Sequence, residues 1–167
     1  MAQLKEKNLV TKVKPLVENS LVLIVPKDKS KISIEQLPTV NRIAIGTVET
    51  VPAGKYAQQT LTKLNLWNQV ESKIVYGKDV KAVGAYVAEG SADAGFVYKT
   101  DAMDLQNRVE VAAVAPSDSH DAIRYPIAIV TKYDNELAQQ FYDYLTSNEA
   151  QQILQKYGFT SVANSAK

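Results

Sequence analysis

The chain has 167 residues, of which 46% are hydrophobic and 22% charged, and its net charge is +1. These values are typical of a globular protein with a substantial core and argue against global disorder. Because the charge is balanced, the chain lacks the excess of basic residues that binds nucleic acid or an anionic membrane. The absence of cysteine excludes disulfides, thiolate metal sites and a thiol nucleophile.

Hydrophobic patterning and turn residues predict alternating strands and helices. Residues 4–10 are expected to form a short helix, after which Lys14-Pro15 ends regular structure. Strands are expected over 20–25, 42–46, 72–76, 94–98, 109–114 and 124–131. Helices are expected over 52–64, 79–89, 135–146 and 148–157, with Asp79 as an N-cap and Gly90 closing the helix that Asp79 begins. Residues 99–101 are expected to form a turn.

This alternation predicts an α/β fold with a largely parallel sheet flanked by helices. Residues 27–123 are expected to form one complete lobe. The strands over 21–25 and 125–130 are expected to be the two crossings by which the chain enters and leaves that lobe.

The junction between the strand over 42–46 and the helix over 52–64 is a candidate anion site. Pro52 suits the first helical position, because its fixed φ is already helical and its missing N–H has no partner there. Ala53 and Gly54 follow, and their small side chains leave the helix-terminal amides uncovered. The alternative is that Pro-Ala-Gly is an ordinary loop sequence at a helix start and marks no ligand site.

Two further junctions are expected at the same end of the sheet. The helix capped by Asp79 begins at Val80, and Tyr98 lies at the carboxyl end of its strand. Ligands gather at the carboxyl ends of strands in open α/β sheets, so two helix starts and a phenol predict a pocket of neutral donors for an anion. The alternatives are that Asp79 is a plain N-cap and that Tyr98 is a half-buried sheet aromatic.

Catalytic motifs find no support. Gly54-Lys55 does not complete a phosphate loop, because the preceding glycine is Gly46 and Tyr56 stands where Ser or Thr is required. His120 is the only histidine, which excludes a histidine-rich metal site, and it is expected to be an ordinary loop residue. Without a nucleophile–base pair or paired carboxylates, the sequence predicts a binding protein without a cofactor and not an enzyme.

In combination, several segments closely resemble the molybdate-binding protein of ABC transporters. The matching segments are Ile43–Gly46, Val51–Ala57, Asp79-Val80, Asp93–Ala102, Tyr125–Ala128, Phe141–Leu145 and Tyr157–Phe159. They follow one another through nearly the whole chain with similar spacings, which makes the set far more specific than any one motif.

The resemblance implies a type II periplasmic-binding-protein-like fold of two α/β lobes joined by two crossing strands. It implies that the oxyanion, molybdate or tungstate, is contacted by the backbone N–H of Ala53 and of Val80 and by the hydroxyl of Tyr98. These residues meet the metal only through the oxygens of molybdate. The implied partners are the membrane permease and ATPase of an ABC importer, and the implied location is the periplasm or the cell surface as a lipoprotein.

One departure from the family is large. In this family, strands and helices of the first lobe precede the segment equivalent to 2–10, and they supply serine hydroxyls and amides to the ligand. We expect no counterpart of these elements in this chain, and no signal sequence. Residues 1–26 and 124–167 are therefore expected to hold the hinge strands and a remnant of the first lobe, with weak or absent binding. Apolar residues of the last two helices are expected to mediate self-association, namely Leu137, Phe141, Leu145, Ile153 and Leu154. An alternative is an effector domain of a transcription regulator with the same two-lobed topology.

Overall fold

The computed structural model describes residues 1–162 and divides the chain into two compact units. Unit 1 combines Met1–Asn19 with the segment from Ile123 onward, and unit 2 is Ser20–Ala122. No helix within residues 1–162 has the length and apolar character needed to cross a bilayer. Unit 2 begins at Ser20 and not at residue 27, because the strand that follows Ser20 is paired on both sides within the sheet of this unit.

Unit 2 is built on a five-stranded mixed sheet in the order β4-β3-β5-β2-β6. Its strands are β2 (Leu21–Pro26), β3 (Ile43–Gly46), β4 (Ile74–Gly77), β5 (Ala94–Tyr98) and β6 (Val109–Val114). β3 runs parallel to β4 and β5, whereas β2 runs antiparallel to β5 and β6. The interior strand β2, which lies between β5 and β6, is buried along its whole length, as its uninterrupted apolar run predicts for a strand covered on both faces.

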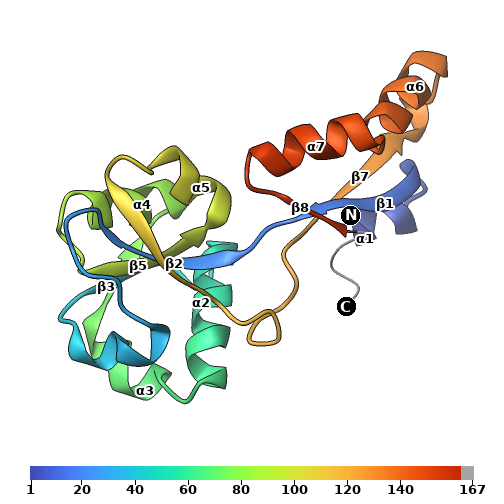
Figure 1. The fold of residues 1–167 in the computed structure, drawn as a ribbon. Helices are drawn as coiled ribbons and strands as arrows, with labels where there is room; N and C mark the ends of the chain where they lie inside the picture. Colours follow the sequence, from blue (N-terminus) through green and yellow to red (C-terminus); the bar gives the residue numbers. More distant parts are fainter. Residues whose placement is uncertain (163–167) are drawn as a thin grey trace. The chain divides into compact units, whose positions relative to one another are not determined.

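Helices cover both faces of this sheet. They are α2 (Pro52–Lys63), α3 (Trp67–Val70), α4 (Val80–Ala88) and α5 (Lys99–Asp104), with short 3₁₀ segments over Ile34–Thr39 and Glu71–Lys73. Figure 1 shows α4 and α5 on one side of the sheet and α2 and α3 on the other. Gly90 adopts φ +72°, the left-handed conformation expected of a glycine just beyond a helix end.

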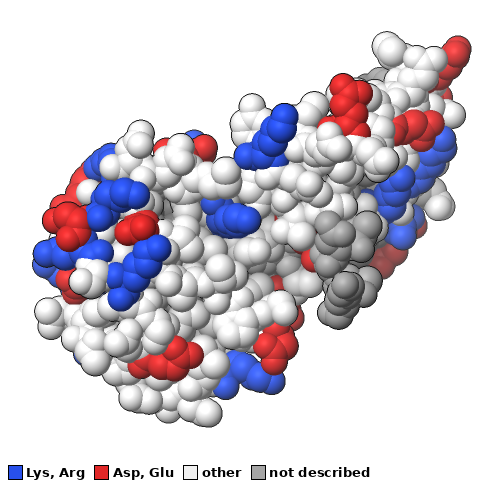
Figure 2. All heavy atoms as spheres, in the orientation of Figure 1, with Lys and Arg blue, Asp and Glu red and all other residues white. Residues whose placement is uncertain are grey.

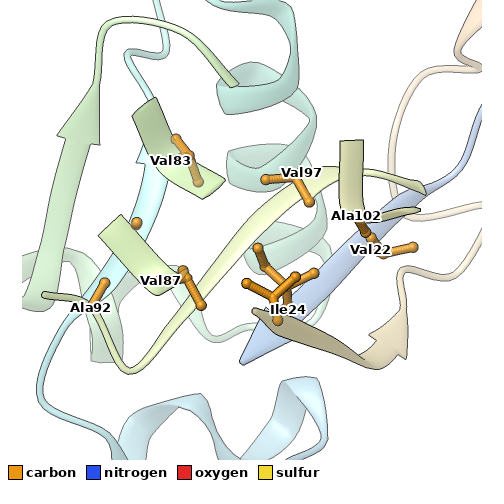
Figure 3. Close-up of a cluster of buried hydrophobic side chains, with 9 residues drawn as sticks. Val22, Ile24, Val83, Val87, Ala92, Val97 and Ala102 are labelled. Atoms are coloured by element: carbon orange, nitrogen blue, oxygen red, sulfur yellow. The ribbon is translucent and has the colours of Figure 1, made fainter. Parts of the chain in front are cut away.

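One hydrophobic cluster joins the sheet to α4 and α5. Alternate residues of β2 and β5 meet the buried face of α4, and Figure 3 shows their side chains pointing toward one another: Val22, Ile24, Val83, Val87, Ala92, Val97 and Ala102. Side chains of a strand alternate between faces, so Leu23 and Phe96, which are also fully buried, belong to the α2 side. This two-sided packing holds the carboxyl ends of the parallel strands, and the helices that follow them, in fixed positions.

Unit 1 contains a three-stranded antiparallel sheet in the order β7-β1-β8. Its elements are α1 (Ala2–Glu6), β1 (Val10–Glu18), β7 (Arg124–Val130), a 3₁₀ turn (Thr131–Tyr133), α6 (Glu136–Leu145), α7 (Asn148–Lys156) and β8 (Thr160–Ser161). Asn135 and Ser147 cap α6 and α7 by accepting hydrogen bonds from the amides of Ala138 and Ala150. Tyr142 anchors α6 to β1 by donating its hydroxyl hydrogen to the carbonyl of Lys12.

Three expectations about local structure were wrong. The expected helix over 4–10 is α1, which already ends at Glu6, and Val10 is the first residue of β1. Lys14-Pro15 does not end regular structure, because both residues lie inside β1, where Pro15 sits opposite Pro126. Irregular register on either side of this pair and a positive φ of 48° at Lys12 accommodate the missing proline donor. The expected turn over 99–101 is instead the first turn of α5, which starts directly after β5.

Unit 1 exposes much of its apolar surface. Leu137 and Phe141 on α6 are 74% and 60% exposed, and Ile153 on α7 is also exposed, whereas Leu145 and Leu154 are half-buried. A groove of about 500 Å³ runs along α1, β7 and α6, and none of its lining side chains carries a charge.

Candidate oxyanion site in unit 2

The loop between β3 and α2 is tied to the end of β4. The Thr47 amide donates to the Gly77 carbonyl at 2.9 Å, and the Thr47 hydroxyl lies 3.2 Å from the same oxygen. The Val51 amide donates in turn to the Thr47 carbonyl at 2.8 Å. The loop therefore fixes the start of α2 relative to two neighbouring strands.

Gly54 serves close packing of α2 on the sheet. A Cβ atom at Gly54 would lie 1.9 Å from the Gly46 carbonyl oxygen, so only glycine permits this approach. The Gly54 amide donates to the Val51 carbonyl at 2.9 Å, so it is not available to a ligand as the sequence suggested. Ala53 is the second residue of α2, so no helical carbonyl lies four positions before it to accept a hydrogen bond from its amide.

The two helix starts differ in their caps. α2 has Val51 at its N-cap, whose side chain has no acceptor for the terminal amides. At the start of α4, Asp79 accepts a hydrogen bond from the Ala82 amide at 2.8 Å, as predicted for an N-cap. Val80 is the first residue of α4 and is half-buried. The carboxylate satisfies Ala82, which leaves the first positions of α4 as the helix-terminal donors.

Tyr98 closes β5. It lies opposite Leu21 of β2, and the following amide, that of Lys99, donates to the Ser20 carbonyl at 2.9 Å. The Tyr98 side chain is half-buried. Nearby in sequence, burial raises the pKa of the Asp101 carboxyl, with a smaller contribution in the same direction from Asp104.

The topology brings all three predicted residues to one edge of the sheet. β3 lies between β4 and β5 and is parallel to both, so the three carboxyl ends share an edge. Ala53 follows β3, Val80 follows β4, and Tyr98 ends β5. The structure thus places two helix starts and a phenol on three adjacent strands.

The surroundings of this edge carry no dominant charge. A cavity of about 300 Å³ lies beside the start of α2 and is lined by residues 48–52, Lys55, Tyr56 and Asp121. Lys55 and Asp121 in its wall lie 3.8 Å apart and are both more than half exposed. On the face shown in Figure 2, basic and acidic side chains are interspersed with uncharged surface. The charged residues in this wall are Glu49, Lys55 and Asp121, so the wall itself supplies no excess of positive charge to an anion.

Within residues 1–162 no group of three histidine or acidic side chains could hold a metal ion. His120 packs its ring against Tyr56, with 5.6 Å between centroids, and its Nδ1 lies 2.7 Å from the Asp121 carbonyl oxygen. Sequence reasoning missed the side-chain contacts between α2 and the loop that contains Ser119, His120 and Asp121, because isolated Gln, Thr and Ser residues form no recognisable motif.

The sequence matches one family model and several curated relatives. A family model for bacterial extracellular solute-binding proteins matches residues 1–160. A Bacillus subtilis protein, provisionally named ABC transporter substrate-binding lipoprotein YvgL, is 49% identical over 87% of this chain and 57% of its own length. Molybdate-binding protein ModA of Haemophilus influenzae is 39% identical over 96% of this chain and 66% of its own length. The chain thus spans less than two thirds of either relative.

Solved structures agree with this placement. The substrate-binding domain of a provisionally assigned molybdenum ABC transporter from Clostridium difficile matches with a TM-score of 0.91 and 38% identity, over 97% of this chain and 72% of that one. The periplasmic molybdate-binding protein of Azotobacter vinelandii matches with a TM-score of 0.75 over 95% and 73%, and its 22% identity shows a shared fold. These neighbours confirm the expected fold class, and the family consists of solute-binding proteins and not enzymes. The chain belongs to the family of bacterial extracellular solute-binding proteins.

Proposed function

We propose that this chain captures molybdate, or the similar tungstate ion, at the carboxyl edge of the unit 2 sheet for an ABC importer. The backbone amides of Ala53 and Val80 and the hydroxyl of Tyr98 are the proposed donors. The observation that carries the proposal is that the two helix starts and Tyr98 lie at the carboxyl ends of three adjacent parallel strands. The relatives named for molybdate binding support the choice of ligand.

Neutral donors suit a protein that must release its cargo. Hydrogen bonds from amides and hydroxyls to an ionised oxygen are about twice as strong as neutral ones, so several of them hold a dianion without a lysine or arginine. The partial positive charges at the starts of α2 and α4 add to this attraction. Discrimination against the smaller sulfate then depends on cavity size and not on charge.

The proposed partners are the permease and ATPase of the importer, and the chain itself is proposed to lie on the outer side of the membrane. The relative named as a substrate-binding lipoprotein of an ABC transporter supports this location. We infer that the chain by itself binds weakly, with a dissociation constant above the micromolar range, because lobe closure around the ligand ordinarily supplies much of the affinity.

Isothermal titration calorimetry with sodium molybdate tests the site. Replacing Tyr98 by phenylalanine removes one charge-assisted hydrogen bond and should weaken binding by about 1–2 kcal/mol. The matched control is Tyr144→Phe on α6 in unit 1, which should bind like the wild type. Equal affinity of the Tyr98→Phe variant and the wild type would remove Tyr98 from the site.

A second copy of the chain is the proposed partner of the apolar face of unit 1. Within residues 1–162, β7 is an edge strand with one side unpaired, and two such edges can pair antiparallel about a two-fold axis. The uncharged groove beside it brings no like charges together across such a contact. Sedimentation velocity should show a dimer that Phe141→Glu dissociates and Val114→Glu, at an exposed residue of unit 2, leaves intact. A monomer at high micromolar concentration would contradict this proposal.

A further inference from the structure

The segment 116–121 is fastened to one face of α2 by side-chain contacts. This segment follows β6 and ends where the chain passes from unit 2 to unit 1. The α2 residues that contact it are Lys55, Tyr56, Gln59 and Thr60, which are spaced so that they share one side of the helix. We refer to these contacts as the α2 clamp.

The buried part of the clamp is a directed chain of hydrogen bonds. Thr60 is fully buried and Ser119 is 5% exposed, and their hydroxyl oxygens lie 3.0 Å apart. Ser119 donates to the Pro116 carbonyl at 2.6 Å. A hydroxyl has a single hydrogen to donate, so Thr60 must be the donor to Ser119. Each hydroxyl is thereby satisfied away from water, which makes a displacement of either segment unfavourable.

The outer part of the clamp is reciprocal. The Gln59 side-chain amide donates from Nε2 to Asp121 Oδ2 at 2.8 Å, and its Oε1 accepts from the Asp121 backbone amide at 3.0 Å. Gln59 thus donates one hydrogen bond to Asp121 and accepts another from it. The two bonds together fix both the distance and the rotation of α2 relative to the segment. A glutamate at position 59 would keep the acceptor but face the Asp121 carboxylate with a second negative charge.

The clamp and the glycine contact hold α2 at two separate points. Near its start, Gly54 rests on the Gly46 backbone. Gln59 lies six residues after Ala53, which is about 9 Å further along the helix axis. A helix fixed at both points cannot tilt about its first turn, so the direction of its terminal amides is set by the clamp as well as by the strand.

We propose that Gln59 and Thr60 are positioning residues that aim the Ala53 amide at the bound oxyanion, an inference that rests on the proposed function of this edge. Neither side chain touches the anion. They act by holding α2 against the segment 116–121, so the terminal dipole and the Ala53 donor keep one orientation. Hydrogen bonds weaken steeply as their angle departs from linear, so a small tilt of α2 lowers affinity.

A polarity swap tests the outer contact. Gln59→Glu should lower molybdate affinity roughly five- to tenfold, the factor that loss of one or two hydrogen bonds carries. Adding Asp121→Asn restores a donor at position 121 with the net charge of the wild type, so the double variant should recover the wild-type affinity. For the buried contact, Thr60→Val should weaken binding in the same direction, whereas Thr60→Ser, which keeps the hydroxyl, should not.

Amide NMR spectra of the ligand-free chain separate this inference from the proposed function. Gln59→Glu should shift the signals of residues 53–55, and Asp121→Asn should return them, whether or not molybdate binds. Absence of molybdate binding by the wild type, with these shifts present, would overturn the proposed function and with it the proposed aim of α2 at an anion. Unchanged signals and affinity in Gln59→Glu, or a double variant no better than the single one, would overturn the positioning role.

Discussion

Replacing Gly54 by alanine isolates the contact that seats α2 on the sheet. The added methyl would lie 1.9 Å from the Gly46 carbonyl oxygen and 2.5 Å from its carbon, and both are backbone atoms that cannot rotate away. Cβ atoms essentially never approach closer than 3.0 Å, so α2 and β3 must separate by about 1 Å. Separation opens the packing between the helix and the sheet beneath it.

The expected energy follows from two opposing effects. Overpacking of a well-packed core against unyielding atoms costs about 3 kcal/mol, whereas alanine gains about 1 kcal/mol over glycine inside a helix. The net loss in unfolding free energy should be about 2 kcal/mol. The same substitution should weaken molybdate binding, because the shift moves the adjacent Ala53 amide.

Gly84 in α4 is a matched control. A methyl there would meet only Leu105 Cδ1 within 3.4 Å, at 2.5 Å, and this is the end of a flexible side chain. Repositioning Leu105 costs about 1 kcal/mol, which the gain in helix propensity offsets. Urea denaturation should therefore show a large loss for Gly54→Ala and little change for Gly84→Ala. Equal stability of the two variants would refute the close-packing role of Gly54.

Substitutions at two further positions, Asp79 and Asp101, test a helix cap and a half-buried carboxylate of unit 2. Asp79→Ala should lower the unfolding free energy by about 1 kcal/mol in urea denaturation, because the Ala82 amide loses its cap. Asp79→Asn keeps a capping oxygen and should leave the unfolding free energy nearly unchanged. Similar losses for both variants would contradict the capping role. Burial raises the pKa of Asp101 above 3.8, so the native state binds more protons than the unfolded state between 3.8 and that higher pKa, and stability falls as pH rises through this window. Asp101→Asn should therefore be more stable than the wild type at pH 7, with an advantage that disappears below pH 3.8; an advantage independent of pH would point to packing instead of charge.

Local signals predicted most of unit 2. The apolar runs of β2 and β5 and the N-cap at Asp79 have short-range causes that can be read from neighbouring residues. Alternating strands and helices predicted parallel strands with the candidate donors at their carboxyl ends, and β3, β4 and β5 follow that pattern. The antiparallel pairing of β2 with β5 and β6 departs from the largely parallel sheet that was expected. By contrast, β1 was missed, because its pairing with β7 joins residues more than a hundred positions apart and tolerates Pro15 through irregular register.

The contacts of the three candidate residues with a ligand stay a prediction, but their places in the fold can be compared with the expectation. The resemblance named Ala53, Val80 and Tyr98, and the topology places them on adjacent strand ends. The two small residues after Pro52 looked equivalent in sequence, yet Gly54 is used for packing and its amide is bonded to Val51. Only the three-dimensional approach of Gly46 distinguishes them. The α2 clamp depends on contacts between residues about sixty positions apart, which no local pattern encodes.

The central claim is that the carboxyl edge of the unit 2 sheet holds the oxyanion through neutral donors. The most direct measurement is an NMR titration of the ¹⁵N-labelled chain with sodium molybdate, with sodium sulfate as the comparison. We expect molybdate to shift the amide signals of Ala53 and Val80 and of their neighbours, and sulfate to shift them less at equal concentration. Shifts confined to the lysine-bearing strand β1 of unit 1, or no shifts at any accessible concentration, would contradict the account.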